Sequence, residues 1–80
     1  MLTVHVKLFA TLVRARPGWR HGQAMAVAVA PGADLGHLLA HLDLTPDQVR
    51  HVFVNGQRRP LDYIPQDGDE LAIFPPIAGG

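Results

Sequence analysis

The residues best suited to take part in a chemical reaction stand at the end of the sequence, where Ile77-Ala78-Gly79-Gly80 follow the stiff pair Pro75-Pro76. The prolines keep such a tether extended at low entropic cost, and six residues reach up to ~20 Å. Because glycine has no Cβ atom, a chain end built from it can thread a narrow site in backbone conformations that other residues avoid. The pattern predicts a tail that delivers its terminal carboxylate into the active site of a partner protein.

The chemistry open to that carboxylate is acyl activation. A free carboxylate is a poor acyl donor because its oxygen is a bad leaving group, but adenylation by ATP converts it to a mixed anhydride that sulfur can attack. The product would be a thiocarboxylate on Gly80, which is itself a good sulfur nucleophile. The chain has no cysteine, so a thiol side chain cannot carry sulfur in its place.

The other polar residues do not combine into a site of their own. His37 and His41 stand four residues apart, but no glutamate completes an HExxH pattern and no third ligand is evident, which favours a solvated helix face. Asp67, Asp69 and Glu70 are too closely spaced for a calcium loop and favour a plain turn. No Ser/His/Asp set and no phosphate-cradling glycine loop is readable. We therefore expect neither a metal site nor a site for ATP or catalysis on this chain.

Composition excludes several further classes of function. The 80 residues carry seven Lys or Arg and seven Asp or Glu, for a formal net charge of zero with neutral histidines. The basic residues are scattered, which argues against a nucleic acid partner. No run approaches the ~18 apolar residues of a membrane helix, and the first residues lack the apolar stretch of a signal peptide. Together with the absence of cysteine, this composition leads us to expect a cytoplasmic protein.

The first half of the chain predicts two strands and a helix. Apolar residues alternate over residues 2–8, and large residues alternate with alanines over 24–29, which indicates two strands joined as a hairpin. Between them we expect a brief helical turn that docks Leu12 inward. Asp34 is placed to cap a helix whose single apolar face has the spacing i, i+3, i+4, i+7 and consists of Leu35, Leu38, Leu39 and Leu42.

The second half predicts two more strands. A capping-box turn at 45–48 leads into a strand at 52–54, and Asn55-Gly56 is the strongest short hairpin signal. Leu61 and Ile64 are expected to anchor an irregular stretch. The last strand, 71–74, should stop pairing at Pro75-Pro76 because proline has no N–H to donate.

This order of elements predicts an α+β protein with a β-grasp (ubiquitin-like) fold. One helix covers one face of a mixed four- to five-stranded sheet, and the proposed fold implies that the first and last strands pair in parallel at the centre. We expect the β-grasp domain to span residues 1–76 and residues 77–80 to form a flexible C-terminal tail.

A candidate docking patch lies beside the tail. If Leu71 and Ile73 face the helix, then Ala72 and Phe74 face outward, and the same alternation turns Phe53 outward on the neighbouring strand. Exposed aromatic residues next to a tether suit a protein partner; the alternative is that a loop covers them. The predicted partner-binding patch consists of Phe53, Ala72, Phe74, Pro75 and Pro76.

The closing segment, residues 67–80, resembles the C-terminal signature of the MoaD/ThiS family of β-grasp sulfur carriers, which includes the small subunit of molybdopterin synthase. The segments 6–12, 31–35 and 54–56 also resemble that small subunit. The Arg-rich loop at 13–22, which contains Trp19, and the turn at 57–60 have no counterpart that we can match.

The resemblance implies a non-catalytic carrier subunit of a molybdopterin synthase-type complex. An adenylyltransferase related to ubiquitin-activating enzymes would use ATP to activate Gly80, which would then carry the sulfur. The tail residues Gly79, Ala78 and Ile77 would insert into the large subunit of molybdopterin synthase, where sulfur passes to a pterin precursor. The pair Pro75-Pro76 favours the molybdopterin type over the thiamine type.

Two groups of alternatives remain open at this point. The same carrier chemistry could serve thiamine synthesis, tRNA thiolation or cysteine synthesis. The chain could also be a plain β-grasp interaction module, or a ubiquitin-like modifier joined to lysines through Gly80.

Overall fold

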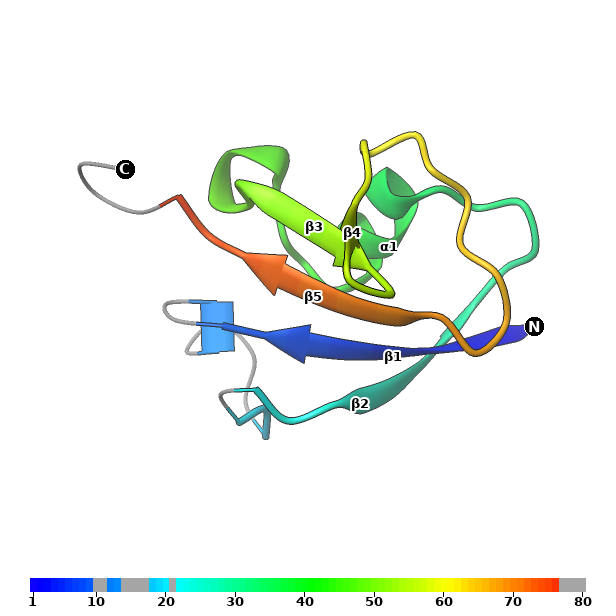
Figure 1. Cartoon of the computed structure of the whole chain (residues 1–80), viewed down its shortest axis with the longest axis horizontal. Coiled ribbons are helices and arrows are strands. Elements are labelled where there is room, and N and C mark those ends of the chain that lie inside the picture. The colour runs from blue at the N-terminus through cyan, green and yellow to red at the C-terminus, as the bar shows by residue number, and fades with distance from the viewer. Residues whose placement is uncertain (10–11, 14–17, 21, 77–80) are drawn as a thin grey trace.

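The structure is a computed structural model that describes residues 1–9, 12–13, 18–20 and 22–76. Within these ranges, the regular elements are five strands, one α-helix and one 3₁₀ turn (Figure 1). The elements in chain order are β1 (Leu2–Leu8), β2 (Met25–Val29), α1 (Leu35–His41), a single 3₁₀ turn (Pro46–Gln48), β3 (His51–Val54), β4 (Gln57–Arg58) and β5 (Glu70–Phe74).

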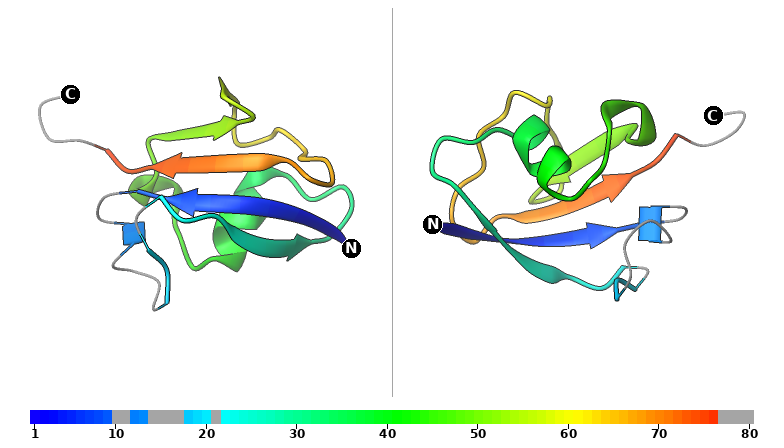
Figure 2. Two further views of the ribbon diagram at one scale, coloured as in Figure 1. Left: turned by 60° about the horizontal axis from the view of Figure 1, so that its bottom comes forward. Right: turned by 180° about the vertical axis from the view of Figure 1, so that it is seen from behind.

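The strands form one mixed sheet in the order β2-β1-β5-β3-β4. Strands β1 and β5 are parallel, with Val6 opposite Leu71, and the other neighbours are antiparallel. Helix α1 lies across one face of the sheet, and none of the described residues forms an α-helix on the opposite face (Figure 2). The predicted β-grasp order, with the first and last strands side by side and parallel, is therefore confirmed.

The core lies between α1 and the sheet. Strand alternation decides which side chains enter it: Val4, Val6 and Leu8 are buried, whereas Thr3 and His5, at the alternate positions, are exposed. The remaining buried hydrophobic residues are Leu12, Val29, Leu35, Leu38, Leu39, Leu42, Leu44, Val52, Val54, Leu71 and Ile73. Leu12 and all four leucines of the predicted helix face thus lie in the core, as expected. In the part of the chain that is described, no helix is long and apolar enough to span a bilayer.

Helix α1 begins where the sequence predicts, because Asp34 caps it. The Asp34 carboxylate accepts a hydrogen bond from the backbone N–H of His37 at 2.9 Å and lies 2.7 Å from His37 Nδ1. The backbone hydrogen bond and then the side-chain contact with His37 hold the pKa of Asp34 below its usual value.

Replacing Asp34 by alanine is expected to lower the melting temperature, and the loss should depend on pH. A carboxylate with a depressed pKa stabilises the fold above its unfolded pKa, and that contribution is lost as pH falls through the folded pKa. The difference in melting temperature between wild type and Asp34→Ala should therefore shrink on acidification. Asp34→Asn, which keeps a capping oxygen without the charge, is the matched control. A difference that stays constant down to strongly acidic pH would contradict this account.

The irregular segment between β4 and β5 attaches through its backbone, and here one sequence prediction is wrong. Leu61 and Ile64 are 37% and 52% exposed, so they are not anchors. Instead, the carbonyl oxygens of Leu61 and Tyr63 accept hydrogen bonds from the first N–H groups of α1. The apolar contact comes from Tyr63, which packs against the core. The segment is therefore held against the start of α1 by its carbonyl groups and not by its aliphatic side chains.

Candidate functional site

The segment that precedes the predicted tail lies at the end of the central strand, β5. Pairing of β5 stops where its prolines begin: Arg50 N donates to Phe74 O at 2.8 Å, and the next residue, Pro75, is buried. Pro76 is exposed and is the last described residue. The predicted tail residues, Ile77, Ala78, Gly79 and Gly80, lie outside the described residues.

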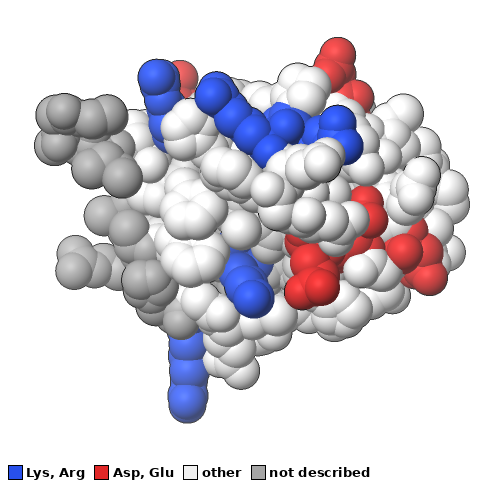
Figure 3. Space-filling model, viewed as in Figure 1, with Lys and Arg blue, Asp and Glu red and all other residues white. Residues whose placement is uncertain are grey.

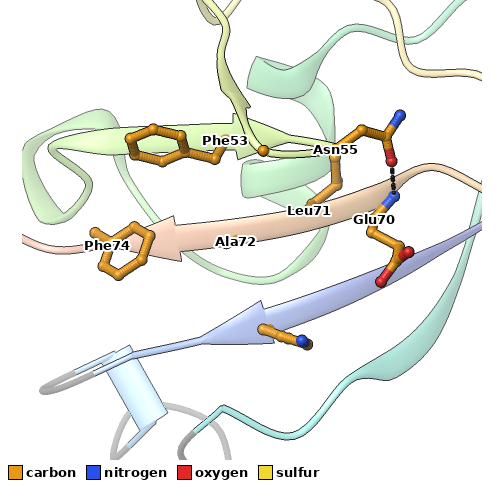
Figure 4. A pocket seen from close by; sticks show the side chains of 8 residues that line it. Phe53, Asn55, Glu70, Leu71, Ala72 and Phe74 are labelled. Carbon is orange, nitrogen blue, oxygen red and sulfur yellow. Dashed lines mark hydrogen bonds between the residues drawn. The ribbon is translucent and has the colours of Figure 1, made fainter.

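Three aromatic rings cross the sheet just before this point. The Phe9 ring stacks on Phe74 with centroids 4.5 Å apart and planes 7° apart. The Phe53 ring meets the other side of Phe74 edge-on, at 5.7 Å and 84°. Both geometries are favourable for aromatic pairs. The aromatic row, defined as Phe9, Phe53 and Phe74, therefore spans β3, β5 and the residue after β1. Figure 4 shows Phe53 and Phe74 on the face of the sheet opposite α1.

A shallow hollow of about 560 Å³ adjoins the row on this same face. Phe53 and Phe74 stand at one end of it, Ala72 lies between them and the other end, and Asn55 and Glu70 stand at the far end (Figure 4). The full lining is Lys7, Phe53, Asn55, Gly56, Glu70, Leu71, Ala72 and Phe74. Of the predicted patch, the structure thus brings Phe53, Ala72 and Phe74 together, whereas Pro75 and Pro76 do not line the hollow.

Sequence reasoning missed two residues on this face. Phe9 completes the aromatic row, and Lys7 adds a charge to the hollow. The signal was available for both, because they continue the outward-facing positions of β1 beyond His5. The loss of hydrophobic alternation after Leu8 concealed the position of Phe9.

Asn55 fixes β3 against β5 and so holds Phe53 beside Phe74. Its backbone N–H donates to Glu70 O at 2.8 Å, and its side-chain oxygen accepts from Glu70 N at 3.0 Å. Its Nδ2 donates to the carboxylate of Asp69 at 2.9 Å, which is 7% exposed. Asn55 also adopts a positive φ of 52°, as the two-residue hairpin with Gly56 requires.

Replacing Asn55 by glycine is expected to destabilise the fold by about 1–3 kcal/mol, because the buried Asp69 carboxylate loses a donor. Glycine tolerates the positive φ, so this variant isolates the side-chain bonds. Asn55→Ala should cost more, since it adds backbone strain. Urea unfolding measures both variants; equal stability of Asn55→Gly and wild type would show that the hydrogen bonds contribute nothing.

The charges around the aromatic row are unevenly distributed. Lys and Arg side chains gather above the β3–β4 edge and acidic ones toward the start of β5, leaving an uncharged area near the end of β5 (Figure 3). His51 borders this area, with its ring edge-on to Phe53 at 6.2 Å. Burial, and then the nearby Arg58 and Arg50, hold the pKa of His51 below its usual value. Both effects favour the neutral form of His51, which suits the uncharged area beside it.

The described residues offer no arrangement of three or more His, Cys, Asp or Glu side chains that could hold a metal ion. The helix histidines follow the predicted solvated arrangement: His37 and His41 are both exposed, and His37 contacts Asp34.

Known proteins share this fold, and the sequence similarity to one family includes the residues of the predicted tail. The model of the ThiS family matches residues 6–80. The crystal structure of small archaeal modifier protein 1 from Haloferax volcanii is similar, with a TM-score of 0.76, 28% identity, and coverage of 96% of this chain and 100% of that one. No curated protein matches the sequence.

Two further similar structures support the fold alone. One is a putative molybdopterin converting factor subunit 1 from Pyrococcus furiosus, with a TM-score of 0.72 and 23% identity over 96% of this chain and 100% of that one. The other belongs to a complex of subunits 1 and 2 of the molybdopterin-converting factor from Helicobacter pylori, with a TM-score of 0.62 and 21% identity over 99% and 100%. Because the family model matches residues 6–80 and the sheet has the β-grasp topology, the chain belongs to the ThiS family.

Proposed function

We propose that this protein is a sulfur carrier that donates sulfur in molybdopterin biosynthesis. An adenylyltransferase transfers AMP from ATP to the carboxylate of Gly80 with release of pyrophosphate, and sulfide then attacks the acyl carbon and displaces AMP to form the thiocarboxylate. The large subunit of a molybdopterin synthase then receives the tail, and its own groups catalyse sulfur transfer to the pterin precursor. In this proposal the chain supplies the reactive end and the docking face but no catalytic side chain.

The observation that carries the proposal is the position of Pro76. It is exposed at the carboxyl end of the central strand, directly after the aromatic row, and the family match continues from there to residue 80. A partner that binds Phe53 and Phe74 would therefore receive whatever follows Pro76. Burial of such an aromatic cluster is a common source of binding energy between proteins.

The similarity to subunit 1 of molybdopterin-converting factors favours this pathway, since one such structure is a complex with subunit 2. The cytoplasm, where ATP-dependent activation takes place, is the proposed location. Thiamine synthesis, tRNA thiolation and cysteine synthesis use the same carrier chemistry and are the competing acceptors.

Intact mass tests the carrier chemistry directly. After co-expression with a candidate adenylyltransferase and a sulfur source, the chain should gain about 16 Da, because one carboxylate oxygen is replaced by sulfur. Supplying the thiolated protein to a molybdopterin synthase large subunit and to a thiazole-forming enzyme then separates the pathways. A chain that is adenylated and thiolated but serves only the second enzyme would overturn the molybdopterin assignment.

A second candidate function is that of a protein modifier joined through Gly80 to lysine side chains. It is favoured by the 28% identity to small archaeal modifier protein 1. An isopeptide-linked ladder, without any species heavier by the sulfur increment, would support the modifier and contradict the carrier.

A further inference from the structure

The two outer edges of the sheet differ in how well they are protected. The β4 edge is two residues long, carries Arg58, and is followed at once by Arg59 and Pro60. Short length, charge and proline are the usual means by which a strand edge avoids pairing with another chain. The β2 edge has none of them: it is five residues long, and the sequence from Gln23 to Ala30 contains no charge and no proline.

Hydrogen bonding within the sheet shows which backbone groups of β2 remain available. His5 N donates to Asp69 O at 2.9 Å, so the odd-numbered residues of β1 direct their backbone groups toward β5. The even-numbered ones therefore face β2, in agreement with the bond from Gly22 N to Leu8 O at 3.2 Å.

The partners of those even-numbered residues are Met25, Val27 and Val29. These three residues use their N–H and C=O groups for β1, and the intervening residues, Ala26 and Ala28, point theirs away from the sheet. Strand β2 is terminal in the sheet order, so no described strand accepts or donates a hydrogen bond on the outer side of Ala26 and Ala28, although both residues lie opposite residues of β1 on the inner side. Both alanines are exposed.

We infer that the outer edge of β2 pairs with β2 of a second copy of this chain, antiparallel about a two-fold axis at Val27. In this register Ala26 exchanges both backbone hydrogen bonds with Ala28 of the second copy, and Ala28 does so with Ala26. The two Val27 residues face each other as a directly opposed pair without hydrogen bonds. An isologous contact of this kind requires one surface to be complementary to itself, and the alternation of available groups around Val27 satisfies that requirement.

Charge and side-chain packing favour a second copy as the occupant. Two uncharged segments approach without like-charge repulsion. On the helix side of the edge, the half-buried Val27 lines a hollow of about 380 Å³ together with Met25, Trp19 and Leu42. Pairing would bring Val27 of the second copy to the mouth of this hollow. On the opposite side, the small alanine side chains leave room for an approaching strand.

The pairing leaves the candidate functional site open, and the inference does not rest on the proposed function. The tail follows β5, which is separated from β2 by β1 (Figure 1). In a continuous sheet related by a two-fold axis, both helices lie on one face and both aromatic rows on the other. Since one pair of short strands buries less than a standard interface, we expect a weak dimer, with a dissociation constant on the order of 10–1000 μM.

Single cysteines test the register. The chain has no cysteine of its own, and directly opposed residues without hydrogen bonds have Cβ atoms ~4.5–5.5 Å apart, close enough for a disulfide after small adjustment. Under a glutathione buffer, Val27→Cys should form a disulfide-linked dimer at least ~10-fold faster than Ala30→Cys. In the proposed register the two copies of residue 30 are about 20 Å apart, so this exposed position is the matched control. Equal rates at the two positions would overturn the inference.

A second test removes one outward-facing N–H donor from the outer edge of β2. Ala26→Pro deletes an N–H that β1 does not use, which an edge strand tolerates. Sedimentation velocity over a range of concentrations should show a weak dimer for wild type and for Ala26→Ser, and at least a ~10-fold weaker one for Ala26→Pro. A wild-type chain that stays monomeric at millimolar concentration, or a folded Ala26→Pro chain that dimerises as well as wild type, would contradict the proposal. If Ala26→Pro fails to fold, the cysteine comparison decides alone.

Discussion

Deletion of Gly80 is expected to abolish sulfur transfer completely while leaving the fold intact. If the terminal carboxylate of Gly80 is the reactive group, a chain that ends at Gly79 presents its carboxylate one residue too short, up to ~3.5 Å from the required position. Misplacement of this size is enough to remove catalysis. The measurement is formation of the thiocarboxylate by intact mass, followed by sulfur transfer to the acceptor enzyme.

The control for this deletion is stability. Strand β5 ends at Phe74, so the loss of one residue well beyond the sheet in sequence should leave the urea midpoint unchanged. Gly79→Ala, which keeps the length but adds a Cβ atom, should form product slowly instead of not at all. Full activity of the shortened chain would overturn the carrier mechanism and favour a plain interaction module.

Replacement of Phe74 by alanine is expected to weaken binding of the activating enzyme and of the acceptor subunit by about 30- to 1000-fold. This corresponds to the 2–4 kcal/mol typical of a central aromatic residue in an interface. Phe74 contacts both Phe9 and Phe53, so its removal also separates the other two rings. Isothermal titration with each partner measures the effect.

A second aromatic residue provides the control for this substitution. Tyr63 also packs against the core, but it lies in the segment between β4 and β5 and contacts Arg59. Tyr63→Ala should lower stability while leaving partner affinity within about 3-fold of wild type. If Phe74→Ala and Tyr63→Ala weaken binding equally, the effect belongs to stability and the docking role of the aromatic row is wrong.

The elements that the sequence predicts well are those whose signals are local. The alternation in β1, the cap at Asp34 and the Asn55-Gly56 hairpin depend on residues within a few positions of one another. Their bounds agree with the structure to within one residue. The parallel pairing of β1 with β5 came from the proposed fold, because no local pattern encodes contact between the two ends of a chain.

The predictions that failed or were incomplete depend on distant contacts. Leu61 contributes its carbonyl oxygen to an N–H group at the start of α1, and its side chain stays exposed; this contact joins residues far apart in the sequence. The buried carboxylate of Asp69 is stable only because Asn55, fourteen residues earlier, donates to it. The position of Phe9 against Phe74 likewise requires β1 and β5 to be adjacent.

The parallel pairing of the first and last strands has a consequence for synthesis and turnover. Strand β1 is synthesised before the other strands but cannot acquire its central neighbour until β5 has emerged from the ribosome, so the core closes only after β5 has been made. In the other direction, an exopeptidase that trims the carboxyl end past Pro76 next meets the strand that lies in the middle of the sheet. Cleavage there would unfold the whole body, so a chain that has lost residues of β5 should be cleared quickly and should not persist as a competing, inactive ligand.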